Sequence, residues 1–143
     1  MYIDGLVEPI NPGGIGAYAF LIYEGNKKIW EEYGIIGENL SSNQSEYFAC
    51  IKALEKLLYL NLKDEEILIN SDSSLLINQL KGIYRVRSRR ILPLYEKVKV
   101  LLLNFKKVNF NWIPRKENFE ADNLTRKAYL DYIKKLRNKE LNY

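Results

Sequence analysis

The sequence contains no histidine and only one cysteine, Cys50. The absence of histidine excludes Ser-His-Asp and Cys-His catalysis, histidine-ligated zinc, and the commonest general base of enzymes. A lone cysteine can form neither an intrachain disulfide nor a cysteine-rich zinc site. If the protein is an enzyme, carboxylates together with a hard metal ion are the main chemistry that remains.

The sequence also lacks any apolar run near the ~18 residues that a membrane-spanning helix needs, and its N-terminus lacks a signal-peptide pattern. We therefore expect a cytoplasmic protein without a membrane partner, and the single cysteine fits a reducing compartment. The length of 143 residues favours one domain, 1–143, which is long enough to bury a core without disulfides. Cys50 recurs with apolar residues at helical spacing, so we expect it in that core.

Positive charge is unevenly distributed along the chain, although the net charge is only +4. One basic stretch contains Lys81, Arg85, Arg87, Arg89, Arg90, Lys97 and Lys99, and a second contains Arg126, Lys127, Lys134, Lys135, Arg137 and Lys139. Such a patch is typical of a protein that binds a polyanion such as nucleic acid, but an ordinary solvated surface has the same composition. The charge alone leaves both interpretations open.

Apolar periodicity and turn residues predict one α/β domain with the element order βββαβααβα. The expected strands are 1–4, 15–23, 28–36, 66–71 and 108–113, and the expected helices are 44–60, 73–80, 91–103 and 117–137. We expect Gly5 to break the first strand and the first three strands to pair antiparallel. Trp112 and Tyr33 lie in strand patterns and are expected in the core.

Asp72 directly follows the expected strand 66–71, and two interpretations of it compete. It could cap the next helix, because Asp accepts hydrogen bonds from the free N–H groups of a first helical turn. It could instead bind a ligand or metal, because the carboxyl ends of strands in α/β proteins are common binding positions. On this stretch alone the cap is the commoner case.

Four acids are expected at the ends of neighbouring elements. Asp4 ends the first strand, Asp72 ends the fourth, Glu46 lies in the first turn of helix 44–60, and Asp122 lies early in the last helix. We expect the two strands side by side in the sheet centre, so that all four carboxylates meet.

Carboxylates gathered in this way need a cation. Two of them ~5 Å apart repel by about 3 kcal/mol at an effective dielectric constant of ~20. Oxygen-only ligation suits Mg²⁺ or Mn²⁺, and two such ions ~4 Å apart can drive an in-line phosphoryl displacement. The alternative for Glu46 and Asp122 is that the helix dipole favours an acid in a first turn.

Four motifs occur in a fixed order along the chain. They are Tyr2-Ile3-Asp4-Gly5 followed by Asn11-Pro12-Gly13-Gly14-Ile15-Gly16-Ala17; Ser42-Asn43-Gln44-Ser45-Glu46-Tyr47; Asn70-Ser71-Asp72-Ser73; and Trp112-Ile113-Pro114-Arg115 through Asn118-Phe119-Glu120-Ala121-Asp122. With these motifs on this succession of elements, the chain resembles type 1 ribonuclease H over nearly its whole length. The resemblance implies the ribonuclease H-like α/β fold, a five-stranded mixed sheet with helices on both faces.

The resemblance also implies an endonuclease that hydrolyses the RNA strand of RNA–DNA hybrids with two Mg²⁺ or Mn²⁺ ions. Asp4 and Asp72 would ligate these ions, Glu46 would hold one ion and sense the ribose 2′-hydroxyl, and Asp122 would complete the second site. Substrate contacts are implied for Gly5, Ser42, Asn43 and Gln44. We expect a monomer, and double-stranded RNA stays open as a further partner.

The chain departs from many members of that family in two respects. The histidine that often precedes the last aspartate is missing, and Arg115 is the cation that could stabilise the departing phosphate. A long basic handle is also missing, so the DNA strand's phosphates would be bound by Arg85, Arg87, Arg89 and Arg90. Two alternatives remain: a catalytically silent nucleic-acid-binding module of the same fold, and a DNA-cutting nuclease of the same superfold.

Overall fold

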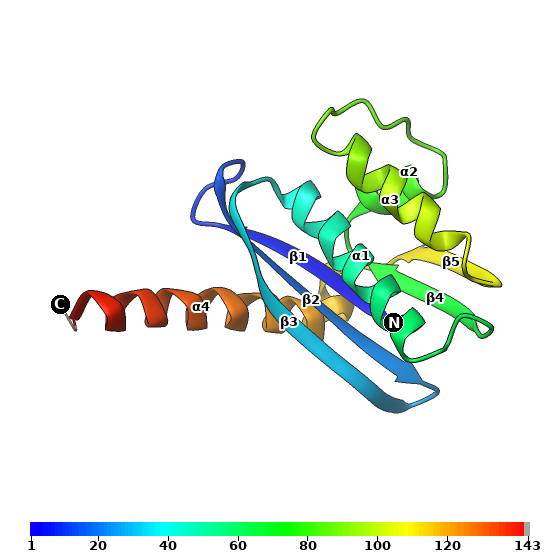
Figure 1. Ribbon diagram of the computed structural model, residues 1–143, viewed down its shortest axis with the longest axis horizontal. Helices are drawn as coiled ribbons and strands as arrows, with labels where there is room; N and C mark the ends of the chain where they lie inside the picture. The colour runs from blue at the N-terminus through cyan, green and yellow to red at the C-terminus, as the bar shows by residue number, and fades with distance from the viewer. Residues whose placement is uncertain (142–143) are drawn as a thin grey trace.

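The computed structural model describes residues 1–141 and has the predicted order of elements (Figure 1). The strands are β1 (Tyr2–Glu8), β2 (Gly14–Glu24), β3 (Lys27–Leu40), β4 (Glu66–Ser71) and β5 (Lys107–Trp112). The helices are α1 (Ser42–Tyr59), α2 (Ser74–Leu80), α3 (Leu92–Leu102) and α4 (Phe119–Leu141), with a 3₁₀ turn, η1 (Arg115–Asn118), before α4. Residues 142–143 of the expected domain lie outside the described residues.

The strands form one five-stranded mixed sheet in the order β3-β2-β1-β4-β5. The first three strands pair antiparallel, whereas β4 is parallel to both β1 and β5. The predictions of an antiparallel first half and of β1 beside β4 are therefore confirmed. β1 pairs with β2 along its whole length, but with β4 only at Tyr2 and Asn70. The two central strands thus separate soon after they meet, which leaves one edge of β1 open.

The prediction that the first strand ends at Asp4, with Gly5 as its breaker, is wrong. β1 continues to Glu8 because its pairing with β2 runs unbroken to the Glu8–Ile15 pair, and this pairing stabilises glycine in an extended conformation. The third strand is also longer than predicted, since it follows β2 as far as Leu40. The last helix begins after the turn η1 rather than at residue 117, and it extends to Leu141.

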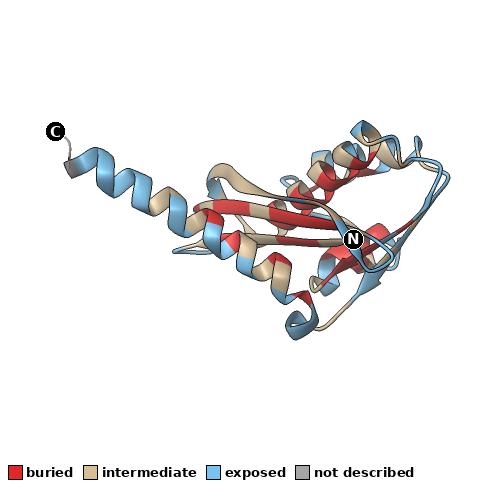
Figure 2. Ribbon diagram, turned by 90° about the horizontal axis from the view of Figure 1, so that it is seen from below, coloured by how far each residue is buried: buried red, intermediate tan, exposed pale blue. Residues whose placement is uncertain are grey.

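Helices cover both faces of the sheet, as expected. α1 packs on β1 and β2 from one side, and α4 packs on β1, β2 and β3 from the other (Figure 1). The larger core lies on the α1 side and contains Phe20, Tyr47, Leu54 and the fully buried Cys50, as predicted. Figure 2 shows the C-terminal part of α4 exposed and extending past the sheet. Among residues 1–141, no helix combines the length and apolar character that crossing a bilayer requires.

Candidate active site

Gly5 allows α1 to approach the centre of β1 closely. A Cβ atom added at Gly5 would lie 2.4 Å from the backbone nitrogen of Glu46 and 2.4 Å from the carbonyl carbon of Ser45. Any side chain at this position would therefore push the helix away from the strand. Asp4, the preceding residue, directs its side chain to the opposite face of β1, where it meets Thr125 of α4. This local geometry brings Glu46 beside Asp4.

Glu46 lies beyond the first turn of α1, contrary to the prediction. The helix starts at Ser42 and is capped by Ser41, whose hydroxyl accepts a hydrogen bond from the backbone N–H of Gln44. Because the favourable effect of the helix dipole falls off within the first turn, it does not account for Glu46. A buried glutamate at this position needs another partner.

Asp72 is not the cap of the following helix. Ser73 caps α2, and its hydroxyl accepts a hydrogen bond from the N–H of Leu76 at 3.2 Å. The capping interpretation of Asp72 is therefore wrong, and its carboxylate is available for other contacts. The backbone carbonyl of Asp72 accepts a hydrogen bond from the indole Nε1 of Trp112.

Trp112 does not lie in the core. It is 50% exposed because it ends β5, the edge strand of the sheet. Tyr33, the other aromatic residue expected in the core, is partly buried.

Three of the four predicted carboxylates lie together. Asp4, Glu46 and Asp72 each offer a carboxylate oxygen within 4.8 Å of the other two. Asp4 and Glu46 are only 5% and 7% exposed, whereas Asp72 is more open to solvent. Asp122 lines the same pocket, but its carboxylate pairs with Arg115 at 3.6 Å and with Arg126 at 3.5 Å.

Burial and mutual repulsion raise the pKa values of the clustered acids. Burial, followed by the charge of Asp72, raises the pKa of Asp4 to about 7 against the opposing hydrogen bond from Thr125. The pKa of Glu46 rises well above its ordinary value, because of burial first and then the charges of Asp4 and Asp72. Burial also raises the pKa of Asp72, although a hydrogen bond from Asn118 opposes it. Such a cluster is relieved either by protons or by a cation.

The donor atoms of the cluster fit a hard divalent cation. All are carboxylate oxygens, the ligands that Mg²⁺ and Mn²⁺ prefer. The Oε2 atom of Glu46 is buried without a hydrogen-bond partner, and leaving a buried polar atom unpaired raises the free energy of the folded state. The residues present therefore fit the predicted metal ions.

Two buried polar residues behind the cluster were not predicted. Asn118 donates from Nδ2 to the carbonyl oxygen of Ile3 at 2.9 Å. The hydroxyl of Thr125 lies 3.0 Å from Oδ2 of Asp4 and 2.8 Å from the carbonyl oxygen of Asp122. A signal existed for Thr125, since it lies three residues after Asp122 and so on the same side of a helix.

The predicted substrate-contact residues before Glu46 lie at the start of α1. Ser42 lines the pocket, and its backbone N–H donates to the side-chain oxygen of Asn11 at 3.0 Å. The Oδ1 atom of Asn43 is buried without a partner. The side-chain oxygen of Gln44 accepts a hydrogen bond from the N–H of Ser41, so it already serves the helix cap.

The predicted arginines occupy two different places. Arg115 lines the carboxylate pocket beside Asp122. The four other arginines are exposed in the loop between α2 and α3, at the top of Figure 1, and do not line that pocket: Arg85, Arg87, Arg89 and Arg90. Within residues 1–141 none of these four forms an ion pair.

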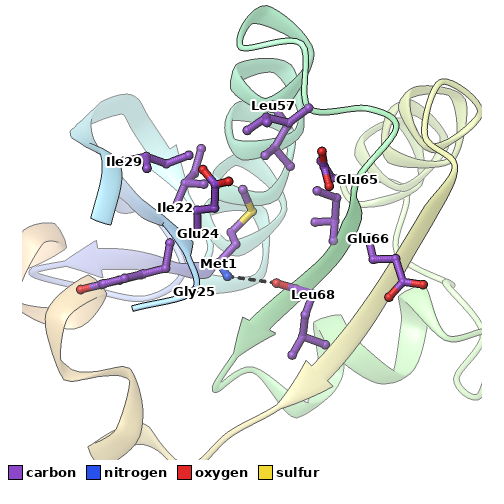
Figure 3. Close-up of a pocket in the computed structure, with 12 residues that line it drawn as sticks. Met1, Ile22, Glu24, Gly25, Ile29, Leu57, Glu65, Glu66 and Leu68 are labelled. Atoms are coloured by element: carbon purple, nitrogen blue, oxygen red, sulfur yellow. Dashed lines mark hydrogen bonds between the residues drawn. The ribbon is translucent and has the colours of Figure 1, made fainter. Parts of the chain in front are cut away.

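A separate pocket lies at the other end of the sheet, where β4 begins (Figure 3). Its lining is mixed: apolar side chains such as Ile22, Leu57 and Met1 line it together with the acidic residues Glu24 and Glu65. None of the predicted site residues is part of it. The four predicted acids line the carboxylate pocket and not this one.

The family described as "Reverse transcriptase-like" matches residues 8–128 of the chain. The matched region contains Glu46, Asp72 and Asp122 and begins after Asp4. A bifunctional protein of Mycobacterium tuberculosis is 28% identical over 118 residues, which is 82% of this chain and 32% of that protein. The chain thus spans about one third of that relative's length. The putative hydrolase EbsB of Enterococcus faecalis is 25% identical over 129 residues, 90% of this chain and 91% of that protein.

Solved structures with the same fold include two RNase H1 proteins. The RNase H1 of the halophilic archaeon Halobacterium salinarum is 27% identical with a TM-score of 0.82, and the match covers 91% of this chain and 96% of that one. LC11-RNase H1, isolated from compost and solved in complex with an RNA/DNA hybrid, is 27% identical with a TM-score of 0.84. That match covers 92% of this chain and 96% of the other.

Proposed function

The chain belongs to the reverse transcriptase-like family and has the fold of the RNase H1 structures, and we propose that it is a type 1 ribonuclease H that hydrolyses the RNA strand of RNA–DNA hybrids. The observation that carries this proposal is the buried cluster of Asp4, Glu46 and Asp72, with carboxylate oxygens within 4.8 Å of one another. In its ionised form such a cluster destabilises a fold unless a cation neutralises it, so a purely structural role does not explain it.

Asp4, Glu46 and Asp72 would hold one divalent cation, Mg²⁺ or Mn²⁺, and Asp122 would complete a second position. Cations bound there would stabilise negative charge on the scissile phosphate and lower the pKa of water. Glu46 would also accept a hydrogen bond from the ribose 2′-hydroxyl, the group that distinguishes RNA from DNA. Glu46 is only 7% exposed and lies where α1 contacts β1 at Gly5, beside Asp4.

Substrate recognition is proposed for residues at the pocket edge and in the basic loop. Gly5 and Ser42 line the pocket beside Glu46, and Asn43 and Gln44 follow Ser42 in the first turn of α1. Polar groups of this segment would read the minor groove of the hybrid. Arg115 in the pocket would stabilise charge on the departing phosphate. The arginines of the α2–α3 loop would bind phosphates of the DNA strand: Arg85, Arg87, Arg89 and Arg90.

The test is cleavage of an end-labelled RNA strand annealed to DNA, with Mg²⁺, Mn²⁺ or EDTA. We compare the wild type with Asp72→Asn and with the matched control Asp64→Asn, whose side chain is exposed in the turn before β4. Metal-dependent cutting by the wild type and the control, but not by Asp72→Asn, is expected. Cutting that persists in Asp72→Asn would place the active site elsewhere.

Hybrid binding and an all-DNA duplex separate the proposed function from its two alternatives. Tight binding of the hybrid without cutting under every metal would identify a silent binding module. Equal cutting of a duplex made only of DNA would identify a DNA nuclease of the same superfold. An RNA–RNA duplex tests whether double-stranded RNA is also cut. The monomeric state and the cytoplasmic location stay predictions.

A further inference from the structure

Thr125 lies fully buried on α4, one turn after Asp122, at the point where the helix crosses β1. Its hydroxyl oxygen is 3.0 Å from Oδ2 of Asp4 and 2.8 Å from the carbonyl oxygen of Asp122. We propose that Thr125 is a positioning residue that fixes the carboxylate of Asp4 for metal binding. This inference rests on the proposed function of the same site.

A threonine within a helix can donate its hydroxyl proton to a carbonyl three or four residues earlier. The hydroxyl of Thr125 has one proton and two acceptors within reach, the Asp122 carbonyl and the Asp4 carboxylate. A hydrogen bond to an ionised carboxylate is roughly twice as strong as one to a neutral carbonyl. The proton therefore points to Asp4 whenever Asp4 is charged, which is the state that binds a cation.

The bond fixes more than one side chain. Thr125 and Asp122 share one turn of α4, whereas Asp4 belongs to β1. By holding Oδ2 of Asp4, Thr125 fixes the position of the Asp4 carboxylate relative to the Asp122 carboxylate. Groups that orient metal ligands in this way typically change metal affinity by 10–100-fold when they are removed.

The alternative is that Thr125 only fills space between α4 and β1. Two substitutions separate these roles. Thr125→Val keeps the shape and the methyl group but removes the hydroxyl, and Thr125→Ser keeps the hydroxyl but removes the methyl group. A space-filling role predicts that valine is tolerated and serine is harmful, whereas a positioning role predicts the reverse for metal binding.

The experiment measures Mg²⁺ binding to the substrate-free protein by calorimetry, together with the Mg²⁺ concentration that gives half the maximal cleavage rate. Thr125→Val is expected to weaken Mg²⁺ binding at least about 10-fold and to raise that concentration in parallel, while Thr125→Ser stays near the wild type. Asp4→Asn serves as the reference for loss of the site. Should the valine variant not fold, Thr125→Ala against Thr125→Ser gives the same comparison.

The inference would be overturned if Thr125→Val bound Mg²⁺ as tightly as the wild type, or if Thr125→Ser lost as much Mg²⁺ affinity as Thr125→Val. It would also be overturned if the wild type bound no Mg²⁺. The binding measurement does not depend on cleavage. A wild type that binds Mg²⁺ but cuts no hybrid would therefore refute the proposed function, while the variants still decide the role of Thr125.

Discussion

The indole Nε1 of Trp112 donates a hydrogen bond to the backbone carbonyl of Asp72 at 3.1 Å. Trp112 is half exposed, and Asp72 is one of the clustered acids, so an environment-sensitive fluorophore lies beside the proposed metal site. The only other tryptophan, Trp30, lies away from the pocket, with the ammonium group of Lys56 4.3 Å from its ring centroid.

We expect Mg²⁺ to change the tryptophan emission of the protein, because metal binding at Asp72 alters the surroundings of the indole. Titration of the metal-free protein measures this change. Trp112→Phe should remove the response and Trp30→Phe should retain it. A response that survives in Trp112→Phe would show that metal binding is sensed elsewhere.

Gly5→Ala should separate α1 from β1, because the added carbon would lie 2.4 Å from backbone atoms that cannot rotate away. We expect a loss of about 1–3 kcal/mol in the free energy of unfolding, measured with denaturant, together with loss of hybrid cleavage. The control is Gly25→Ala, whose new side chain meets nothing within 4 Å but is strained at a φ of +61°. It should cost about 1 kcal/mol and leave cleavage intact.

The metal-free protein should become less stable as the pH rises. Burial and the neighbouring acids raise the pKa of Asp4 from 3.8 to about 7, so the folded protein binds this proton more tightly than the unfolded chain does. The destabilisation therefore develops between about pH 4 and pH 7 and is fully present above the folded pKa. Its size is on the order of 4 kcal/mol, given about 1.4 kcal/mol for each pKa unit.

Asp4→Asn tests this pH dependence, because asparagine carries no charge at any pH. In EDTA its melting temperature should exceed that of the wild type at pH 8 and differ much less at pH 5, while Asp64→Asn should follow the wild type at both. Saturating Mg²⁺ should raise the melting temperature of the wild type but not that of Asp4→Asn at pH 8. A pH-independent difference between Asp4→Asn and the wild type would contradict the assignment.

The arginines of the α2–α3 loop should bind phosphates rather than take part in chemistry. Arg87→Ala with Arg89→Ala should weaken hybrid binding and lower the slope of log affinity against log salt by up to about 2, since each duplex phosphate contact contributes about 0.9. The cleavage rate at saturating hybrid should not change. Lys134→Ala with Lys135→Ala removes equal charge from the exposed end of α4. If this second pair lowers the slope as much as the first, the duplex does not lie where we propose.

The sequence pattern predicted the order of elements because apolar periodicity and turn residues are short-range features, and it identified the clustered acids because each lies within a short motif. Strand 66–71 coincides with β4, and its apolar run needs no knowledge of its neighbours. The end of β1 could not be predicted in the same way. Gly5 is extended because β2 pairs with it, and that pairing joins residues that are distant in the chain.

Other features depend on tertiary position in the same sense. The exposure of Trp112 follows from the place of β5 at the sheet edge, which an alternating strand pattern does not reveal. The hydroxyl of Thr125 can contact Asp4 only because α4 crosses β1, and the sequence does not show this crossing. Asp72 and Ser73 are a further example of what the sequence leaves undecided. Both residue types can cap a helix, and only the folded structure shows that Ser73 does so.

The carboxylate pocket lies where β1 and β4 separate, so it interrupts the pairing of the sheet. The N–H of Asn70 donates to the carbonyl of Met1, and the next carbonyl on that edge of β1 is that of Ile3. In a continuous parallel ladder, a backbone N–H at the end of β4 would reach it. The side-chain amide of Asn118 takes that place instead. A substitution that let the two strands pair further would add hydrogen bonds to the sheet but would fill the space beside the acids that the proposed substrate would enter. Stability of the sheet and access to the acids therefore make opposite demands on this edge of β1.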